Sequence, residues 1–444
     1  ALLLDSHGVL WIGTSGAGLG RFKDGAVAFL SKVDGLGSDR VTALFEDHEG
    51  SLWVGTVDGL SQLTDLKFPI YSSEVGIARG DTLAVAASRA GGVWIGTVAG
   101  VSYFDGSRGT TYFGDEFLAN PYARRVFEAS DGKVYVGDGS HRINVLQDGR
   151  RVGQFRTDDW VEAMVEDSRG LVFSVGGKLM RLRGERLEPY EFEAEQEPAL
   201  GWINNLLVTK DGALWVASNT GVARIQNGFT QRWLTSDGLG SDRVYCLVED
   251  DDGGVWVGLP TGLARIKDQG VVNIGEGHGL HDARIYAIVP DDHGYFWFSS
   301  GRGIFRVRRS ELRDVAEGKE AQVRSEGFDG LESVKFTDRT EQGLSGCKSE
   351  DGRIWFPNPH GVVMIDPVSF HRNKVPPPVH IQHVMADGVE IDPQKRGMLA
   401  VGTKRLEISF VALSYVAPKK VRLEYRLEGM DHDWIESGGR RSVL

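Results

Sequence analysis

A four-residue pattern, Gly-x-apolar-aromatic, recurs nine times along this chain of 444 residues and constrains its fold more than any other feature. Its aromatic residues are Trp11, Trp53, Trp94, Tyr135, Phe173, Trp215, Trp256, Trp297 and Trp355. Their spacings are 42, 41, 41, 38, 42, 41 and 41 residues, and then 58. The loop DGLGSDRV occurs twice, at 34–41 and 237–244, which are five periods apart. A period of this length indicates a repeat architecture.

Each repeat has the pattern of four short strands. In the second repeat, VTALFED alternates apolar and other residues and then meets HEG, a turn in which Gly50 can adopt a positive φ at little cost. The following SLWVGT is β-branched and aromatic, which favours a strand. Four-stranded units repeated at this spacing predict an all-β fold, a β-propeller. We expect the recurrent ring to lie on the second strand and to fill the space between blades, as a structural residue.

The sequence predicts three domains. Residues 1–65 are expected to be the last two blades of an upstream propeller, residues 66–374 a seven-bladed propeller, and residues 375–444 an Ig-like β-sandwich, the first and last being truncated. The sandwich follows from the period-two alternation beyond VPPPV, a stiff connector at 375–379. A single ring of eight or nine blades is the alternative. Within the 58-residue spacing, SELRDVAEGK at 310–319 predicts a short helix capped by Ser310.

Composition narrows the class of partner. The formal net charge of −12 argues against nucleic acid or an anionic membrane surface as the main partner. Cys246 and Cys347 lie in strand-like segments without metal spacing or a disulfide framework, and we expect buried free thiols. No apolar run approaches the roughly 20 residues of a membrane helix. The chain does not begin with Met and its first residues already belong to a repeat, so we expect a piece of a longer protein.

The sequence offers no catalytic, cofactor or metal motif that passes a test of context. GAGLG at 16–20 is not followed by a helical pattern, as a dinucleotide loop would be. EDDDGG at 249–254 falls on the turn that the repeats share, which favours a solvated turn over a calcium loop. The histidine pair in HGLH at 278–281 lacks a third zinc ligand nearby. We therefore expect no catalytic residue, no metal and no cofactor in this chain.

One set of residues is a candidate ligand site. The first strand of a propeller blade begins at the mouth of the central channel, so residues just before it should face a shared cavity. Counting 13 residues back from the recurrent ring gives Tyr122, Trp160, Trp202, Arg243 and Arg284; Arg40 holds this place in the second repeat, and Asp81 or Thr82 in the third. Aromatic rings can stack on sugars, and arginines can bind hydroxyls or carboxylates. The alternative is that these residues cap blade edges or pair with turn acids such as Asp242 and Asp282.

The repeats EDHEGSLWVGTVDGL and EDDDGGVWVGLPTGL, with the loop DGLGSDRV, resemble the two-component regulator propeller repeat. GIFRVRRSELRDVAEGK and GRIWFPNPHGVVMIDP resemble the end of the last propeller in such sensors. The segment 412–441 resembles the three-tyrosine domain that follows, with Tyr415 and Tyr425 matching two of its tyrosines. One departure is SVKFTDRTEQGLSGC at 333–347, where the family usually has a Cys-Asn-Gly-Gly-type loop.

This resemblance implies the periplasmic input portion of an inner-membrane signalling protein. A transmembrane helix and then a histidine kinase or diguanylate cyclase would follow the three-tyrosine domain. The resemblance implies a small-molecule or oligosaccharide ligand, a homodimer formed through the parent protein, and membrane attachment only through that helix. Two other functions stay open: a carbohydrate-active propeller enzyme (a lyase or a glycosidase), and a propeller for protein interaction.

Overall fold

The structure is a computed structural model, and it describes residues 1–23, 25–63, 68–112, 118, 120–184, 186–192, 200–328, 346–368, 376–392, 399, 402–414, 421, 423–429, 431–437 and 442–443. Strands dominate these residues, as the predicted all-β class requires. The chain divides into two compact units, Lys67–Phe370 and the combination of Ala1–Leu66 with His371–Leu444. No helix in the described ranges is both long and apolar enough to span a membrane.

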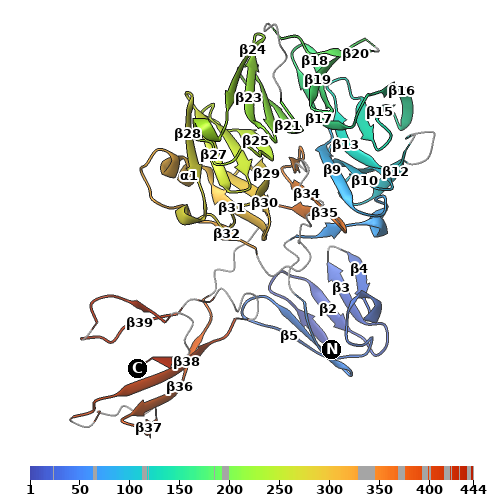
Figure 1. Ribbon diagram of the computed structural model, residues 1–444. Coiled ribbons are helices and arrows are strands. Elements are labelled where there is room, and N and C mark those ends of the chain that lie inside the picture. The colour runs from blue at the N-terminus through green and yellow to red at the C-terminus, as the bar shows by residue number, and fades with distance from the viewer. Residues whose placement is uncertain are drawn as a thin grey trace. The chain divides into compact units, whose positions relative to one another are not determined.

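Seven four-stranded antiparallel sheets, counted over the described residues, form the unit Lys67–Phe370 (Figure 1). We number them as blades 1 to 7 in chain order. They are β9–β12 (Thr82–Ala87, Val93–Thr97, Gly100–Phe104, Gly109–Tyr112), β13–β16 (Ala123–Glu128, Val134–Asp138, Arg142–Gln147, Arg150–Arg156), β17–β20 (Val161–Asp167, Gly170–Val175, Lys178–Arg183, Arg186–Pro189), β21–β24 (Ile203–Val208, Leu214–Ser218, Gly221–Gln226, Phe229–Trp233), β25–β28 (Cys246–Glu249, Val255–Leu259, Gly262–Lys267, Gly270–Ile274), β29–β32 (Ile285–Pro290, Tyr295–Ser300, Gly303–Arg308, Glu326–Gly327), and β33–β35 (Cys347–Lys348, Ile354–Asn358, Gly361–Ile365) with β8 (Ile70–Tyr71).

The seven sheets close into a ring. Their first strands contact one another in the order β9, β13, β17, β21, β25, β29 and β33, and β33 in turn contacts β9. Strand β8 precedes blade 1 in the sequence, yet it is the outermost strand of blade 7, with Tyr71 opposite Val362. The Tyr71 ring also lies 4.8 Å from the Phe104 ring of blade 1, centroid to centroid. The prediction of a seven-bladed β-propeller is therefore confirmed over the alternative of eight or nine blades.

The recurrent aromatic residue lies on the second strand of its blade, as predicted. Trp256 in β26 and Trp297 in β30 are fully buried. Trp256 packs with Ile285 and Phe298 of the next blade, so the hydrophobic core lies between blades. The nine glycines of the pattern all have positive φ, between 76° and 113°, which an L side chain rarely adopts. The glycine of the pattern therefore forms the turn into the second strand, and the aromatic residue packs between neighbouring blades.

The repeated loop is a structural connection between blades. A short 3₁₀ helix lies in four of these loops: η1 (Lys32–Asp34), η2 (Ser73–Val75), η3 (Thr235–Asp237) and η4 (Glu276–His278). In the two identical copies the helix ends at Gly35 and Gly238, whose φ values are 102° and 95°. Asp39 and Asp242 then accept hydrogen bonds from the backbone at the start of each helix. The two identical sequences therefore form the same capped turn between blades.

The helix predicted in blade 6 is present, but its predicted start is wrong. α1 (Arg309–Ala316) follows β31, and its N-cap residue is Arg308 rather than Ser310. Leu312 and Val315 of this helix are buried in the core between blades 5 and 6. The Arg309 guanidinium lies 2.9 Å from the Asp251 carboxylate, so charge pairing with the turn of blade 5 helps to place the helix.

The second unit begins with two sheets of the same design. These are β1–β4 (Leu2–Leu4, Leu10–Gly13, Leu19–Lys23, Ala26–Leu30) and β5–β7 (Val41–Glu46, Leu52–Thr56, Gly59–Leu63). Its C-terminal part contains β36 (Val379–Ala386), β37 (Val389–Ile391), β38 (Leu406–Ala412) and β41 (Ser442–Val443) in one sheet, and β39 (Glu424–Tyr425) with β40 (Ile435–Glu436) in another. Tyr425 lies on β39, whereas Tyr415 and nearly all of the segment 333–347 lie outside the described residues. The domain boundaries at 65 and 374 stay predictions.

Candidate ligand-binding site

A β-bulge marks the start of the first strand in several blades. The register shifts by one residue at this point in blades 1, 2, 3, 4 and 6. The bulged residues are Leu83, Arg124, Glu162, Asn204 and Tyr286. Each follows one of the sequence-predicted site residues by two positions. Bulges re-aim side chains and are frequent beside functional sites.

The backbone holds the predicted residues at one end of their blades. The Trp160 carbonyl accepts a hydrogen bond from the Gly176 amide at 3.3 Å, and the Trp202 carbonyl accepts one from Asn219 at 2.9 Å. The Arg284 carbonyl accepts one from Gly301 at 3.3 Å. In each case the donor belongs to the turn between the second and third strands of the same blade. The predicted residues therefore share the end of the ring at which these turns lie.

Trp160 and Trp202, two of the candidate residues, lie close together although they belong to neighbouring blades. Their rings are T-shaped, with centroids 6.2 Å apart. The Arg124 guanidinium lies 4.5 Å from the Trp160 ring centre, and the His141 ring lies 5.9 Å from it. Trp160 is 37% exposed, in contrast to the fully buried Trp256 and Trp297 of the repeat. We call Arg124, His141, Trp160 and Trp202 the tryptophan cluster.

Charge and burial both act on this cluster. Burial lowers the pKa of Arg124, and the neighbouring Tyr122, Glu162 and Asp159 oppose that shift. The guanidinium stays cationic at neutral pH and makes a cation–π contact with Trp160. Tyr122, the predicted residue two positions before Arg124, is 38% exposed. The cluster therefore combines a fixed positive charge with exposed aromatic surface.

The other two predicted residues lie farther around the ring. Arg243 is exposed, and its guanidinium lies 5.3 Å from the ring centre of Tyr245 in its own blade. Arg284 is exposed at the start of blade 6. The turn acids Asp242 and Asp282 accept backbone amides, from Thr235 at 2.7 Å and from Arg302 at 2.6 Å. These two acids therefore shape loops, and Asp282 also accepts the backbone amide of Arg284 at 3.2 Å.

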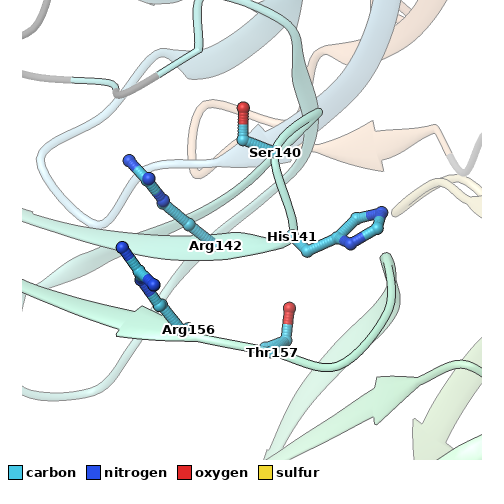
Figure 2. Close-up of a pocket in the computed structure, with 5 residues that line it drawn as sticks. All are labelled: Ser140, His141, Arg142, Arg156 and Thr157. Atoms are coloured by element: carbon cyan, nitrogen blue, oxygen red, sulfur yellow. The ribbon is translucent and has the colours of Figure 1, made fainter.

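A hollow of about 270 Å³ adjoins the tryptophan cluster on blade 2. It is lined by Ser140, His141, Arg142, Arg156 and Thr157. The first three come from the turn into β15, and the last two from the end of β16. Figure 2 shows the Arg142 and Arg156 side chains extending in the same direction from neighbouring strands, with the His141 ring on the other side. His141 lines the hollow and its ring also contacts Trp160, so this residue links the hollow to the cluster.

Glu162 is buried beside this surface and was not singled out by the sequence. Its carboxylate accepts hydrogen bonds from the Ser174 hydroxyl and from the Gly177 and Ile203 amides. Burial raises its pKa, against the lowering effect of these hydrogen bonds and of Arg125. Because Glu162 is fully buried and its carboxylate accepts the Ile203 amide of the next blade, this residue joins blade 3 to blade 4.

The residue types that suggested metal or redox chemistry have structural roles. Asp250, within EDDDGG, is fully buried and accepts the Trp256 indole N–H at 3.0 Å. No group of three metal-ligating side chains occurs in the part of the chain that the structure describes. Cys246 is a buried free thiol, as predicted, whereas the free thiol of Cys347 is only partly buried; desolvation raises the pKa of both to about 12. Such thiols are not nucleophilic at neutral pH.

Two segments, residues 35–58 and 238–260, match the family model of the two component regulator propeller. They include the second strands that carry Trp53 and Trp256 and most of the two copies of the repeated loop. Among curated proteins, none matches the chain.

Solved structures share the fold over its whole length. The chain is similar to the extracellular domain of the hybrid two component system BT3049 from B. thetaiotaomicron, with a TM-score of 0.77 and 17% identity, over 100% of this chain and 63% of that one. The corresponding domain of BT4673 from the same organism gives 0.53 and 19%, with the same coverage. Virginiamycin B lyase from Staphylococcus aureus gives 0.52 and 15%, over 67% of this chain and 98% of the lyase.

At these identities the likeness concerns the fold, and the chain spans 63% of the length of the two extracellular domains. The match to the repeat is more specific, because each matched segment contains a second strand with its recurrent tryptophan and most of the repeated loop. The chain is a β-propeller protein that carries two-component regulator propeller repeats.

Proposed function

We propose that this chain is the ligand-sensing input portion of a membrane-bound signalling protein, placed in the periplasm and attached to the inner membrane through its parent. The output, a histidine kinase or a diguanylate cyclase, lies outside this chain. The regulator repeats support this context, as does the likeness to extracellular domains of hybrid two component systems. We further propose a homodimer formed through the parent protein and no nucleic-acid partner.

The tryptophan cluster is the observation that carries the sensing role. Exposed indole surface costs solvation free energy, and Trp160 is 37% exposed, whereas the recurrent Trp256 and Trp297 are fully buried. The cluster draws Arg124 and His141 from blade 2, Trp160 from the start of blade 3 and Trp202 from the start of blade 4. A sugar ring can stack on Trp160 while Arg124 is kept at the ring by its cation–π contact.

Binding across three blades gives the ligand a means of signalling. A ligand shifts a conformational equilibrium only by its differential affinity for the two states. A molecule that touches residues of blades 2, 3 and 4 favours the arrangement in which those residues are close together. We propose that this preference passes through the C-terminal β-sandwich to the output domain.

The test is ligand binding to the chain and to a double variant, Trp160→Ala with Trp202→Ala. Neutral and acidic oligosaccharides are screened by thermal shift, since binding to the folded state raises its stability. We expect a hit whose affinity, measured by calorimetry, falls at least about tenfold in the double variant, because each lost aromatic contact is worth roughly 0.5–1.5 kcal/mol. Phe229→Ala is the control, as Phe229 is 74% exposed on an outer strand. Unchanged affinity in a folded double variant contradicts the proposal.

An enzyme on the same scaffold is the second candidate, favoured by the likeness to virginiamycin B lyase. That likeness shows the fold alone, and the propeller fold hosts many functions. We propose that the chain itself is not an enzyme, because its buried carboxyl and thiol groups have structural surroundings. Incubating the chain with each oligosaccharide that binds, and analysing products by chromatography, tests this. Turnover by the chain would favour the enzyme.

A further inference from the structure

Blade 2 differs from other blades where its third strand begins. In blades 1, 4, 5, 6 and 7 the third strand begins with a glycine: Gly100, Gly221, Gly262, Gly303 and Gly361. In blade 2 it begins with Arg142, after a three-residue turn in which His141 has a φ of 55°. A non-glycine residue in this left-handed region is uncommon and draws attention to function. The hollow is therefore a local addition to one blade rather than a feature of the repeat.

Two arginines line this hollow side by side. Arg142 and Arg156 are direct partners in the register of β15 and β16, so their side chains leave the same face of the sheet. Figure 2 shows them extending side by side. Like charges directly opposite each other destabilise an antiparallel pair. Among the described residues, neither arginine makes an ion pair that would offset this repulsion.

The other groups of the hollow also suit an anion. None of its lining residues is acidic. The nearby Asp138 is buried, and its carboxylate oxygens accept hydrogen bonds from the Ser140 amide and the Asn144 side chain. Asp138 does not line the hollow. Asp159 accepts the Trp160 amide at 2.7 Å. In a chain of net charge −12, a cationic hollow without a carboxylate is a local exception.

We propose that Arg142 and Arg156 bind the acidic group of a saccharide, a carboxylate or a sulfate, whose ring lies on Trp160. The ligand class is then an acidic oligosaccharide. His141 connects the two parts, since its ring is 5.9 Å from Trp160 and also lines the hollow. Arginine guanidinium groups match the geometry of carboxylates and sulfates with paired hydrogen bonds. This inference rests on the proposed function, because it names the ligand of the same surface.

The test compares charged and uncharged forms of one ligand. The carboxylate probe is a galacturonic acid tetrasaccharide, and its methyl ester is the uncharged partner. The sulfate probe is a sulfated galactose tetrasaccharide, with the desulfated sugar as its partner. Each is titrated by calorimetry into the whole chain and into Arg142→Gln, Arg156→Gln and Arg150→Gln. Arg150 is an exposed residue of the same strand, opposite Gln147 and outside the hollow, and serves as the matched control.

We expect at least one charged probe to bind at least tenfold more tightly than its uncharged partner. Arg142→Gln and Arg156→Gln should each weaken that probe at least tenfold, whereas Arg150→Gln should leave its affinity within twofold. The two hollow variants should melt at the same temperature as the wild type or higher, because each removes a like-charge pair. A loss of binding with unchanged or raised thermal stability separates recognition from a structural role.

Different failures have different meanings. If uncharged sugars bind as well as charged ones and depend on Trp160 and Trp202, the proposed function stands and the acidic ligand class is overturned. If a charged probe binds but Arg142→Gln and Arg156→Gln keep its affinity, the arginine site is overturned. If none of the saccharides binds, both the inference and its sugar-binding basis are overturned.

Discussion

Asp291 shows how one residue joins the turn to the core between blades. Its Oδ1 accepts the backbone amides of His293 and Tyr295 at 2.8 Å, and its Oδ2 accepts the Trp297 indole N–H at 2.8 Å. It is 2% exposed. Asp5, Asp47 and Asp250 hold the same relation to their own tryptophans. The acids of these turns, which read as solvated in the sequence, are therefore part of the fold.

We expect Asp291→Ala to lower the free energy of unfolding by about 3 kcal/mol, because it leaves buried donors without an acceptor. Asp291→Asn should also be destabilising, since an amide NH₂ would face either the indole or the amide donors. The control is Asp292→Ala, which removes an exposed partner of Lys348 and should change stability by no more than about 0.5 kcal/mol. Urea unfolding followed by tryptophan fluorescence measures each. Equal effects of Asp291→Ala and Asp292→Ala would refute this role for Asp291.

Glu162 gives the fold a pH dependence whose sign is set by its burial. Its pKa is raised in the folded state, chiefly by desolvation. Below the pKa of the unfolded state, near about 4.3, Glu162 is protonated in both states and its ionisation does not change the free energy of unfolding. As the pH rises from there through the folded pKa, the unfolded state loses its proton first and stability falls. Glu162→Gln should therefore gain in stability relative to wild type between pH 4 and pH 7, measured by unfolding at each pH. A difference in the free energy of unfolding between Glu162→Gln and wild type that does not change with pH would contradict this.

The candidate site was predictable in part. Period counting found Trp160 and Trp202, because the distance from the recurrent ring to the blade mouth is nearly constant. It missed Arg124 and Glu162, because a bulge shifts the register by one residue and leaves no mark in the pattern of hydrophobic residues. It also missed His141, which lies in a turn one residue longer than its counterparts. The letters SHR, where several other repeats have a glycine, were the available signal.

At the scale of the elements, carboxylates connect several neighbouring blades. Glu128, at the end of β13, accepts the Arg89 amide at 3.0 Å and the Trp94 indole at 2.6 Å from blade 1. Glu166 and Glu249 accept turn amides from blades 2 and 4 in the same way. The near-constant period thus sets both the length of a blade and the register of these links. This is why the strands and the blades could be predicted from spacing alone.

The strand pairing that closes the ring could not be predicted from the sequence, for a physical reason. The period identifies blades, but the outer strand of blade 7 is β8, which lies at the opposite end of the unit and is only two residues long. Tyr71 packs this strand against both blade 1 and blade 7, since its ring lies 4.8 Å from that of Phe104 and 6.0 Å from that of Trp355. The short strand therefore depends on side-chain packing more than on its two paired residues.

We expect Tyr71→Ala to destabilise the unit Lys67–Phe370 by about 2–3 kcal/mol, because a partly buried aromatic between the first and last blades is lost. Hydrogen exchange should then speed up first in β35, whose outer edge depends on β8. Phe229→Ala, on the exposed outer strand of blade 4, serves as the comparison and should stay within about 0.5 kcal/mol of wild type. Uniform exchange across all blades in Tyr71→Ala would show that β8 does not close the ring.

At the scale of the whole molecule, the closing strand makes the unit Lys67–Phe370 self-sufficient. Its inter-blade cores are formed by its own residues, and every first strand has a neighbour on both sides within the ring. The unit should therefore fold without the rest of the chain. Each core cluster is formed by residues of two neighbouring blades, so no blade is stable without its neighbours.

A fragment of residues 67–370 should be monomeric and β-rich, and should unfold cooperatively within a few degrees of the corresponding transition in the whole chain. A matched fragment of residues 76–370 lacks β8. It should melt lower and associate, because the outer edge of β35 is then an unpaired strand open to pairing with another chain. Circular dichroism and light scattering at equal concentrations compare the two fragments. If the longer fragment is unfolded while the whole chain is folded, the ring needs the other unit. If both fragments behave alike, β8 is dispensable and closure rests on the first strands.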